Sequence, residues 1–524
     1  MSQLTRELHE HMKPSDRSMI NEGNHWYSAG ELQSEIKRIQ AIMVHAGIEK
    51  GDRVVLGLPN SYSFLCFFLA IIDYGAVVAT INPEMTDTEF KRFIQRCRPV
   101  HGFVHDRHAA VLFDDSTVNS LSSLCVYHGD LSDLSFYFRT SQRWIRGWEA
   151  EAAFDTCTSV EPSEDETAIL LYTSGTTGAP KAVGLTHRQV YAAARHIIAS
   201  HRLSASDRAY NILPLFHINA QVVTVLSTLL SGGQIIMAPK FSASKFWNVV
   251  IQDKVTWVSA VPAIISILLK IPKPTVIPDS LRMIRSASAP LAPQLAKQFD
   301  DVFGIPLIQS YGMTEAASQI CVNPLPPMKR KPASVGIPYG LELKVVDDQD
   351  QELACGKVGE LTIRGDNVIR CYEDGAGKDA FQDGWFHTGD VGWVDEDGYV
   401  FISGRKKELI NRGGEKISPY EVEQVIRTVS GIKQAAVIGL DDPKYGERVA
   451  AYIVAEEKVQ TDRQELIRAV WEQCKRSLSA HKWPETIEFL PEIPTGPTGK
   501  VQRSLLKHHL LVQNLEIGSI NNHA

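Results

Sequence analysis

The stretch YTSGTTGAPKAVGLTH, which begins at Tyr172, crowds hydroxyl side chains and glycines around a single lysine. Hydroxyl groups can hydrogen-bond to an anion, and glycines let backbone amides approach it without a Cβ in the way. The residues that such an anion would contact are Thr173, Ser174, Gly175, Thr176, Thr177, Gly178 and Lys181. A short apolar run of strand length precedes the loop, and residues with helical apolar spacing follow it. The pattern therefore predicts a phosphate-binding loop between a strand and a helix.

This loop differs in spacing from the phosphate-binding motif G-x-x-x-x-G-K-[ST]. Gly175 and Gly178 are too close together for that motif, and Ala182 follows the lysine where the motif requires a hydroxyl. The alternative is a flexible surface linker, since linkers are also rich in serine, threonine and glycine. The Pro180-Lys181 end argues against a linker, because a linker has no need of an ordered end.

Two later motifs supply carboxylates that a bound nucleotide would use. Glu315, in QSYGMTEAAS, can hold a magnesium ion by one carboxylate, as phosphate-bound magnesium usually is. Asp390, in GWFHTGDVG, stands among glycines at a strand end, where its carboxylate can accept from two neighbouring ribose hydroxyls. Each has a structural alternative, because Glu315 can cap a following helix and Asp390 can be a turn residue.

Basic residues and further glycines follow towards the C-terminus. The stretch GRKKELINRGGEKI holds Arg405, Lys407 and the Gly413-Gly414 pair. Near the end, PTGPTGKVQR places Lys500 in a loop bounded by glycines. Cations are needed beside a phosphate loop because they offset the charge of the anion.

The composition is that of a globular enzyme with more than one domain. At 524 residues the chain exceeds the roughly 250–300 residues at which single cores stop growing. Its net charge of −7 disfavours nucleic acid and anionic membranes as partners. The eight cysteines form no C-x-x-C pair, so neither a zinc site nor a disulfide framework is expected, and a reducing cytoplasm fits. No secretory signal or transmembrane segment is expected, since the apolar run from Phe64 to Ile72 is too short to span a bilayer.

Short β-type runs alternate with helical patterns over most of the chain. Examples are DRVVLGL, GQIIMA and VTWVSAV for strands and GELQSEIKRIQAIMVHAG for a helix. Such alternation predicts α/β layers with largely parallel sheets. From about residue 335 the sequence pattern changes from alternating strands and helices to hairpin-like strands. We expect an α/β fold with a large N-terminal domain of layered subdomains, residues 1–404, and a small α+β C-terminal domain, residues 405–524.

Taken in this order, the motifs resemble those of the adenylate-forming acyl-CoA synthetase superfamily, which also contains firefly luciferase and the adenylation domains of peptide synthetases. The resemblance covers essentially the whole chain, from Gly51 to Lys500. It implies a ligase that joins a carboxylic acid to AMP with release of pyrophosphate and then moves the acyl group to a thiol, using ATP, Mg²⁺ and coenzyme A. No general base is needed for the first step, because a carboxylic acid is already ionised near pH 7. The demand is for positioning and for neutralising phosphate charge.

The resemblance also implies roles for individual residues. The loop from Thr173 to Lys181 would hold the β- and γ-phosphates, Glu315 would bind magnesium, and Lys500 would bridge the α-phosphate and the reacting carboxylate. The residues implied around the adenine, the ribose and the α-phosphate are Ala289, Pro290, Gln309, Tyr311, Gly312, Thr314, Asp390 and Arg405.

Members of this superfamily swing the small domain between the two half-reactions. The position that corresponds to the hinge is Lys407, and after rotation the Gly413-Gly414 loop would line the channel for the pantetheine arm. His217, in LPLFHINAQ, matches an aromatic gate between the acyl pocket and that channel. A core histidine satisfied by backbone groups is the alternative for His217.

Two positions bear on which acid is used. In peptide-synthetase domains an aspartate pairs with the amino acid's ammonium where this chain has His217, so an α-amino acid is disfavoured. Many fatty-acyl members have two glycines where this chain has Ala287 and Ser288, and the added bulk and hydroxyl favour a short or polar acid. Several stretches look like the oxalate–CoA and carnitine–CoA ligase branches, but the pocket departs from the oxalate pattern. Oxalate, short-chain acids and fatty acids therefore stay open as substrates.

The acceptor and the assembly are expectations as well. Coenzyme A is favoured because the chain ends shortly after Lys500 with no carrier domain, and a free acyl carrier protein is the alternative. A homodimer is an open assembly state. A luciferase-like oxygenase would share every motif, whereas a non-catalytic acyl-nucleotide binding protein would be expected to have lost Lys500 or Glu315, and both are present.

The role implied for Lys500 predicts that its loss separates the two half-reactions. Lys500→Ala should abolish acid-dependent pyrophosphate release, because the ammonium no longer opposes the two negatively charged reactants. Transfer of the acyl group from a preformed acyl-adenylate to coenzyme A should persist. Equal loss of both half-reactions, each assayed separately, would contradict this role.

Overall fold

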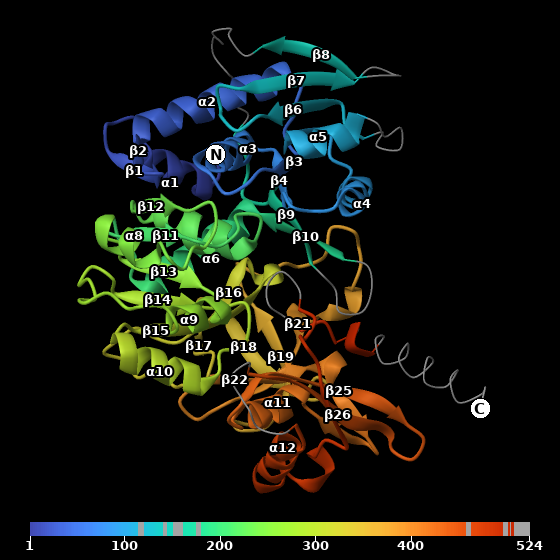
Figure 1. Ribbon diagram of the computed structural model, residues 1–524. Coiled ribbons are helices and arrows are strands. Elements are labelled where there is room, and N and C mark those ends of the chain that lie inside the picture. The colour runs from blue at the N-terminus through green and yellow to red at the C-terminus, as the bar shows by residue number, and fades with distance from the viewer. Residues whose placement is uncertain are drawn as a thin grey trace, which may run out of the picture.

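The computed structural model describes residues 1–113, 120–139, 144–149, 161–173, 180–456, 463–495, 501–503 and 505–507. These residues form two large sheets and two small ones, arranged from top to bottom in Figure 1 broadly in chain order. The α/β fold class predicted from the sequence is confirmed.

The nine-stranded sheet has the order β17-β16-β15-β14-β13-β11-β12-β1-β2. Its strands are β1 (Ser18–Glu22), β2 (His25–Ser28), β11 (Arg208–Asn211), β12 (Gln234–Met237), β13 (Trp257–Ala260), β14 (Met283–Ser286), β15 (Leu307–Met313), β16 (Ser318–Val322) and β17 (Ile337–Pro338). The pairs from β1 through β12, β11, β13 and β14 to β15 are parallel, and the outer pairs are antiparallel. Parallel pairing suits the apolar runs, because helices cover both faces of such strands.

The eight-stranded sheet has the order β10-β9-β4-β3-β5-β6-β7-β8 and is likewise parallel in its centre. Its strands are β3 (Arg53–Gly57), β4 (Val77–Thr80), β5 (His101–His105), β6 (Ser123–Tyr127), β7 (Leu134–Arg139), β8 (Trp144–Glu149), β9 (Thr167–Thr173) and β10 (Lys181–Thr186).

Two five-stranded sheets follow the large ones. The first comprises β18 (Glu342–Val346), β19 (Gly359–Arg364), β20 (Phe381–Gln382), β21 (Trp385–Val394) and β22 (Val400–Arg405), and the second β23 (Ile410–Arg412), β24 (Glu415–Ile417), β25 (Ile432–Asp442), β26 (Gly446–Ala455) and β27 (Thr486–Phe489). The first is the hairpin-rich region expected from about residue 335, and all of its pairs are antiparallel.

Helices connect the strands and cover the sheets. The α-helices are α1 (Gln3–His11), α2 (Ala29–His45), α3 (Tyr62–Tyr74), α4 (Asp87–Cys97), α5 (Asp106–Phe113), α6 (His187–His201), α7 (Ser227–Leu230), α8 (Phe246–Gln252), α9 (Pro262–Leu268), α10 (Pro293–Phe303), α11 (Pro419–Arg427) and α12 (Arg463–Ser477). The other helical turns are the π-helical η1 (Asn219–Leu226) and the 3₁₀ turns η2 (Thr314–Ala316), η3 (Lys378–Ala380), η4 (Lys406–Glu408) and η5 (Ala480–Lys482). Within the described ranges, no helix has both the length and the apolar character needed to cross a membrane.

The predicted phosphate loop does not lie between a strand and a helix. It joins β9 to β10, which pair antiparallel, and α6 begins only at His187. Strand β10 is not evident from the sequence, because its six residues run directly into the helical pattern. Their apolar members, Ala182, Val183 and Leu185, are buried as strand residues, and Thr186 then caps α6 in a capping box with Gln189. Ser174, Gly175, Thr176, Thr177 and Gly178 lie outside the described residues.

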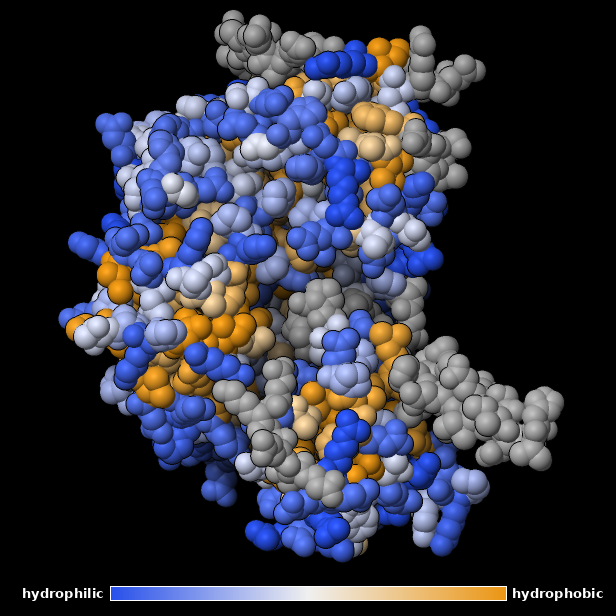
Figure 2. Space-filling view, in the orientation of Figure 1, coloured by the Kyte–Doolittle hydropathy of each residue, from blue (hydrophilic) through white to orange (hydrophobic). Residues whose placement is uncertain are grey.

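The chain folds around separate hydrophobic cores. The largest includes α3, whose apolar run from Phe64 to Ile72 is buried as predicted, and it continues through both large sheets. A distinct cluster, with Ile410 and Ile453 among its members, lies beneath α11 and α12 beyond residue 409. The surface in Figure 2 is largely hydrophilic, with hydrophobic side chains gathered near β14 and α9, where Ile267 is 38% exposed.

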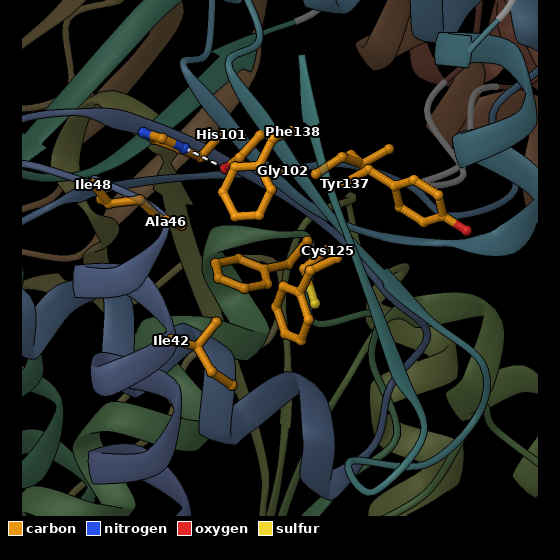
Figure 3. A pocket seen from close by; sticks show the side chains of 12 residues that line it. Ile42, Ala46, Ile48, His101, Gly102, Cys125, Tyr137 and Phe138 are labelled. Carbon is orange, nitrogen blue, oxygen red and sulfur yellow. Dashed lines mark hydrogen bonds between the residues drawn. The ribbon is translucent and has the colours of Figure 1, made fainter. Parts of the chain in front are cut away.

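A small pocket lies away from the predicted site residues, between the end of α2 and strands β5 to β7. Figure 3 shows Ile42, Cys125 and Phe138 around it and the hydrogen bond of 2.6 Å between His101 Nδ1 and Ser123 Oγ. Its volume of about 10 Å³ is room for about one water molecule. It is therefore too small to take a substrate.

The burial of α3 predicts a large cost for truncating it. Ile71→Ala should lower the free energy of unfolding by about 2–5 kcal/mol, because it leaves a cavity at a fully buried side chain. Ile251→Ala on α8 is the matched control, since its side chain is 45% exposed and its loss should cost about 0.5 kcal/mol or less. Urea unfolding followed by circular dichroism measures both, and equal effects would contradict the assigned burial.

Candidate active site

Three of the predicted nucleotide-binding residues meet at the junction of two sheets. Tyr311 comes from β15 of the nine-stranded sheet, whereas Asp390 and Arg405 are opposite each other on β21 and β22. The Tyr311 hydroxyl donates to Asp390 Oδ2 at 2.5 Å, and Arg405 Nε lies 2.8 Å from Asp390 Oδ1. Each carboxylate oxygen has one protein partner and a remaining lone pair, so the group can still accept from a ligand hydroxyl.

The charges in this cluster support one another. Asp390 is 4% exposed, and its ionised form has a cation and a hydroxyl donor within hydrogen-bond distance. Burial and the neighbouring Asp390 carboxylate raise the pKa of Tyr311, so the phenol stays protonated and can donate. Burial alone would lower the pKa of Arg405, but the surrounding acidic groups, with Asp390 the largest contributor, outweigh burial and raise it. The cluster thus holds a buried ion pair whose carboxylate faces a donor on either side.

A second cluster surrounds Glu315. Its carboxylate is 7% exposed, and Oε1 accepts a hydrogen bond of 3.0 Å from the Tyr372 hydroxyl. Burial raises the pKa of Glu315, while the bond from Tyr372 and the charges of Arg405 and Lys181 oppose that shift. Lys181 Nζ lies 4.4 Å from the centroid of the Tyr372 ring, a cation–π contact. Tyr372 therefore connects the carboxylate of Glu315 to the lysine of the predicted phosphate loop.

The mouth of that loop is held by strand pairing. Thr173 and Lys181 are partners in the β9–β10 ladder, so the two ends of the loop lie side by side. Gly377, with φ of +57°, lies against the lysine, since a Cβ at this position would be 2.3 Å from Lys181 Nζ. Asp374 Oδ2 accepts from the backbone N–H of Ala182 at 3.1 Å and fixes the start of β10. Segments far apart in the chain thus position the lysine.

The donor set around Glu315 fits a magnesium ion bound mainly through phosphate oxygens. The described residues contain no group of three or more His, Cys, Asp or Glu side chains that would hold a metal by themselves. Magnesium usually keeps waters and takes one or two protein carboxylates together with substrate phosphates. A single enclosed carboxylate beside a phosphate loop meets that requirement.

The residues predicted at the adenine lie along β15 and after β14. Gln309 lines a cavity of about 320 Å³ together with Leu291 and Asn323. Gly312 has a structural reason to be glycine, because a Cβ there would lie 1.5 Å from the Ser318 carbonyl oxygen across the β15–β16 pair.

The loop that leads to the predicted adenine edge is fixed from one side. Ser288, which has φ of +71°, precedes Ala289 and Pro290, and its Oγ accepts from Asn219 Nδ2 at 3.3 Å. Thr314 opens η2, directly before Glu315.

His217 lies at the start of the turn that leads into η1. Its ring is partly exposed, packs against Phe216 at 4.3 Å between centroids, and makes no hydrogen bond to a described residue. Burial lowers the pKa of His217 to about 4, so the imidazole is neutral at physiological pH. The ring is thus uncharged, and no backbone group of a described residue satisfies it.

Other predicted residues belong to the C-terminal part. Lys407 lies in η4, between the last strand of one small sheet and the first strand of the other. The Gly413-Gly414 turn joins β23 to β24, and its described hydrogen bonds are to Tyr445 and Asn411 of the same part. Lys500 lies outside the described residues.

Sequence reasoning missed Tyr372, Asp374 and Gly377, which position Lys181 and Glu315. They stand together in CYEDGAGK, a stretch that reads as an ordinary turn. Only the packing of this stretch against β10 gives these residues their part in the site.

Comparison with known proteins gives two family matches, similar sequences and a shared fold. Residues 7–373 match the family model of the AMP-binding enzyme, and residues 421–500 match that of the AMP-binding enzyme C-terminal domain. The chain is 42% identical to the sulfoacetate–CoA ligase of Cupriavidus necator over 93% of each chain. It is 34% identical to an oxalate–CoA ligase of Arabidopsis thaliana, over 95% of this chain and 96% of that protein. The crystal structure of ATP-bound MatB from Rhodopseudomonas palustris matches with a TM-score of 0.87 at 27% identity, over 97% of this chain and 98% of that one.

The two family matches agree with the motifs found in the sequence, and so do the similarity to CoA ligases over nearly the whole chain and the shared fold. The chain therefore belongs to the AMP-binding enzyme family and is an acyl-CoA synthetase of the AMP-forming type, which joins a carboxylic acid to coenzyme A at the expense of ATP.

Proposed function

We propose that this ligase activates a short or polar carboxylic acid at the junction of β15, β21 and β22. The observation that carries the proposal is the cluster of Tyr311, Asp390 and Arg405, in which a buried carboxylate keeps free lone pairs between two donors. A ribose offers two adjacent hydroxyls that this carboxylate can accept from, and the Tyr311 ring offers a flat face for the adenine. Gln309, Gly312, Ala289 and Pro290 would complete the adenine edge.

In the first half-reaction an oxygen of the acid's carboxylate attacks the α-phosphorus of ATP, and pyrophosphate leaves. Thr173, Lys181 and the loop between them hold the β- and γ-phosphates, and Thr314 donates to the α-phosphate. Glu315 would hold magnesium, which would neutralise phosphate charge. Lys500 brings a further positive charge to the reacting oxygens. Because the acid is already ionised, these groups work by positioning and by charge stabilisation.

In the second half-reaction the sulfur of coenzyme A attacks the acyl carbonyl carbon, and AMP leaves. We assign residues 1–404 to the adenylating domain and residues 405–524 to a domain that turns about Lys407 between the two steps. Support comes from the separate hydrophobic core beyond residue 409. Among the described residues the two parts are joined by polar contacts such as that of Lys416, whose Nζ is 2.7 Å from Asp348. After rotation Gly413 and Gly414 line the thiol channel, which His217 closes on the acyl side.

The acid class rests on the residues that fill the acyl side of the site. Ala287 is buried, and the Ser288 hydroxyl is held by Asn219, so bulk and polar groups occupy the space that a long alkyl chain would need. Two relatives, the sulfoacetate–CoA and oxalate–CoA ligases, are named for short, polar acids. Both observations favour a short or polar acid over a fatty acid.

Pyrophosphate release tests this function. With ATP and magnesium, acids from oxalate, sulfoacetate and acetate to palmitate are compared with and without coenzyme A, and a signal stimulated by coenzyme A is expected for short or polar acids. Asp390→Asn should raise KM for ATP by about tenfold or more, because the ribose loses its ionised acceptor. Asp301→Asn is the matched control, since its carboxylate is 61% exposed on α10. Activity with palmitate alone would contradict the acid class, and silence with every acid while ATP binds would contradict the function.

The low pKa of His217 predicts that this side chain affects acyl transfer through its shape and not through its charge. The pKa lies near 4 because burial penalises the imidazolium, so the ring stays neutral as pH rises from about 5.5 to 8. His217→Phe should keep the rate of acyl transfer to coenzyme A within about threefold and leave the shape of its pH profile unchanged. His217→Ala should slow this step by about tenfold, because the plate between pocket and channel is lost. Loss of an acid limb in the pH profile of His217→Phe would contradict the assignment.

A further inference from the structure

Arg285 is a buried cation directly beside the proposed acyl site. It is the third residue of β14, between β13 and β15 in Figure 1, and it is 1% exposed. Its Nη2 donates to Ser310 Oγ at 2.8 Å, and its Nη1 reaches Ser259 Oγ at 3.3 Å and Asn219 Oδ1 at 3.4 Å. The guanidinium therefore contacts three elements of the nine-stranded sheet region, β13, β15 and η1.

Every one of these partners is neutral. Among the described residues no carboxylate lies within 4.0 Å of Arg285, and its Nε has no hydrogen-bond partner. Arg282, which precedes β14, is different, because its Nε pairs with Asp207 Oδ1 at 2.8 Å. Burial lowers the pKa of Arg285 to about 9, so the group still carries its charge near neutral pH. A buried charge without a counter-ion is costly, and such groups are normally paired.

The hydrogen bonds of Arg285 lead to the reacting region. Ser310 immediately precedes Tyr311, the proposed adenine plate. Asn219 binds Ser288 through Nδ2 at 3.3 Å, and it follows the gate residue His217 by two positions. Through Asn219, Arg285 is thus connected to Ser288, which stands on the acyl side of the proposed site.

We propose that Arg285 is the counter-ion of a second anionic group, a carboxylate or a sulfonate, on the acid whose other end is adenylated. This inference rests on the proposed function and narrows the substrate to short dianionic acids. The planar guanidinium can donate to two oxygens of such a group, and its free Nε and long Nη1 contacts leave donors for it. The second anion takes no part in bond making or breaking and stays ionised through both half-reactions.

A length limit follows from the same geometry. A long alkyl chain would have to pass Arg285 and Ser259, and it would leave the guanidinium buried against hydrocarbon, which is unfavourable. An acid with only a few atoms between its two anionic groups can neutralise the guanidinium instead. Arg285 therefore acts as a specificity-determining residue at the closed end of the acyl site.

The test compares acids of equal length that differ only in the second charge. Pyrophosphate release is measured with malonate against propionate and with oxalate against acetate, for the unchanged enzyme and for Arg285→Met, Arg285→Lys and the control Arg195→Met. Arg195 lies on α6 with its side chain 47% exposed, so its variant loses the same charge away from the site. The unchanged enzyme should prefer the dianionic acids. Arg285→Met should lower kcat/KM for them by about 100-fold or more.

The remaining variants separate recognition from structure. Arg285→Met should leave the monocarboxylates unaffected or improved, and Arg285→Lys should restore part of the preference, because a cation is again present. Loss of activity towards both members of each acid pair, in equal measure, would assign Arg285 a purely structural part and overturn the proposal. A preference of the unchanged enzyme for monocarboxylates would also overturn it while leaving the proposed function intact.

A binding measurement keeps the inference testable without catalysis. The thermal midpoint is recorded with malonate or propionate in the presence of a non-hydrolysable ATP analogue. Malonate should stabilise the unchanged enzyme more than propionate does, and this difference should vanish in Arg285→Met but persist in Arg195→Met. If pyrophosphate release fails with every acid while this difference is seen, the proposed function fails and the anion site stands. If malonate and propionate act alike on the unchanged enzyme, the anion site is overturned.

Discussion

The buried carboxylate of Asp390 is the interaction on which the arrangement of the site depends. An ionised carboxylate that is 4% exposed is tolerated only where donors replace water, and here Arg405 and the Tyr311 hydroxyl do so. Because these donors come from different sheets, the same contacts that stabilise the charge hold β15 against β21 and β22. The position of the proposed nucleotide site is thus a consequence of satisfying one buried charge.

The same ion pair ties Arg405, the first residue of the proposed C-terminal domain, to the part of the chain that precedes it. Arg405 is the last residue of β22, and η4 with Lys407 follows at once. Arg405, which an ion pair fixes in place, is thus followed directly by η4. This short segment joins two parts of the chain that have separate hydrophobic cores. A rotation about Lys407 would leave the proposed ribose contact in place, since Arg405, although assigned to the C-terminal domain, precedes Lys407 and is paired with Asp390.

Charge balance distinguishes the two ends of the proposed site. At the phosphate end a carboxylate, Glu315, and a lysine, Lys181, share the ring and hydroxyl of Tyr372. At the acyl end Arg285 has neutral partners alone among the described residues. The protein therefore supplies both a negative and a positive charge at the end where a phosphate would bind. At the acyl end the cation has no counter-ion among the described residues, and a second anionic group on the acid would supply one.

The amino-acid sequence by itself determined the alternation of strands and helices, the buried α3 and the residue types of the site, because each of these depends on local spacing or on the chemistry of single motifs. It did not reveal β10, whose six residues merge with the pattern of α6, nor the parts of Tyr372 and Gly377 at Lys181, which lie in an unremarkable turn. Only the tertiary structure decided that Asp390 lies between Tyr311 and Arg405, and that Arg285 has no acidic partner among the described residues. Contacts of this kind join strands distant in the chain, so they follow from sheet register and packing, which local sequence patterns do not encode.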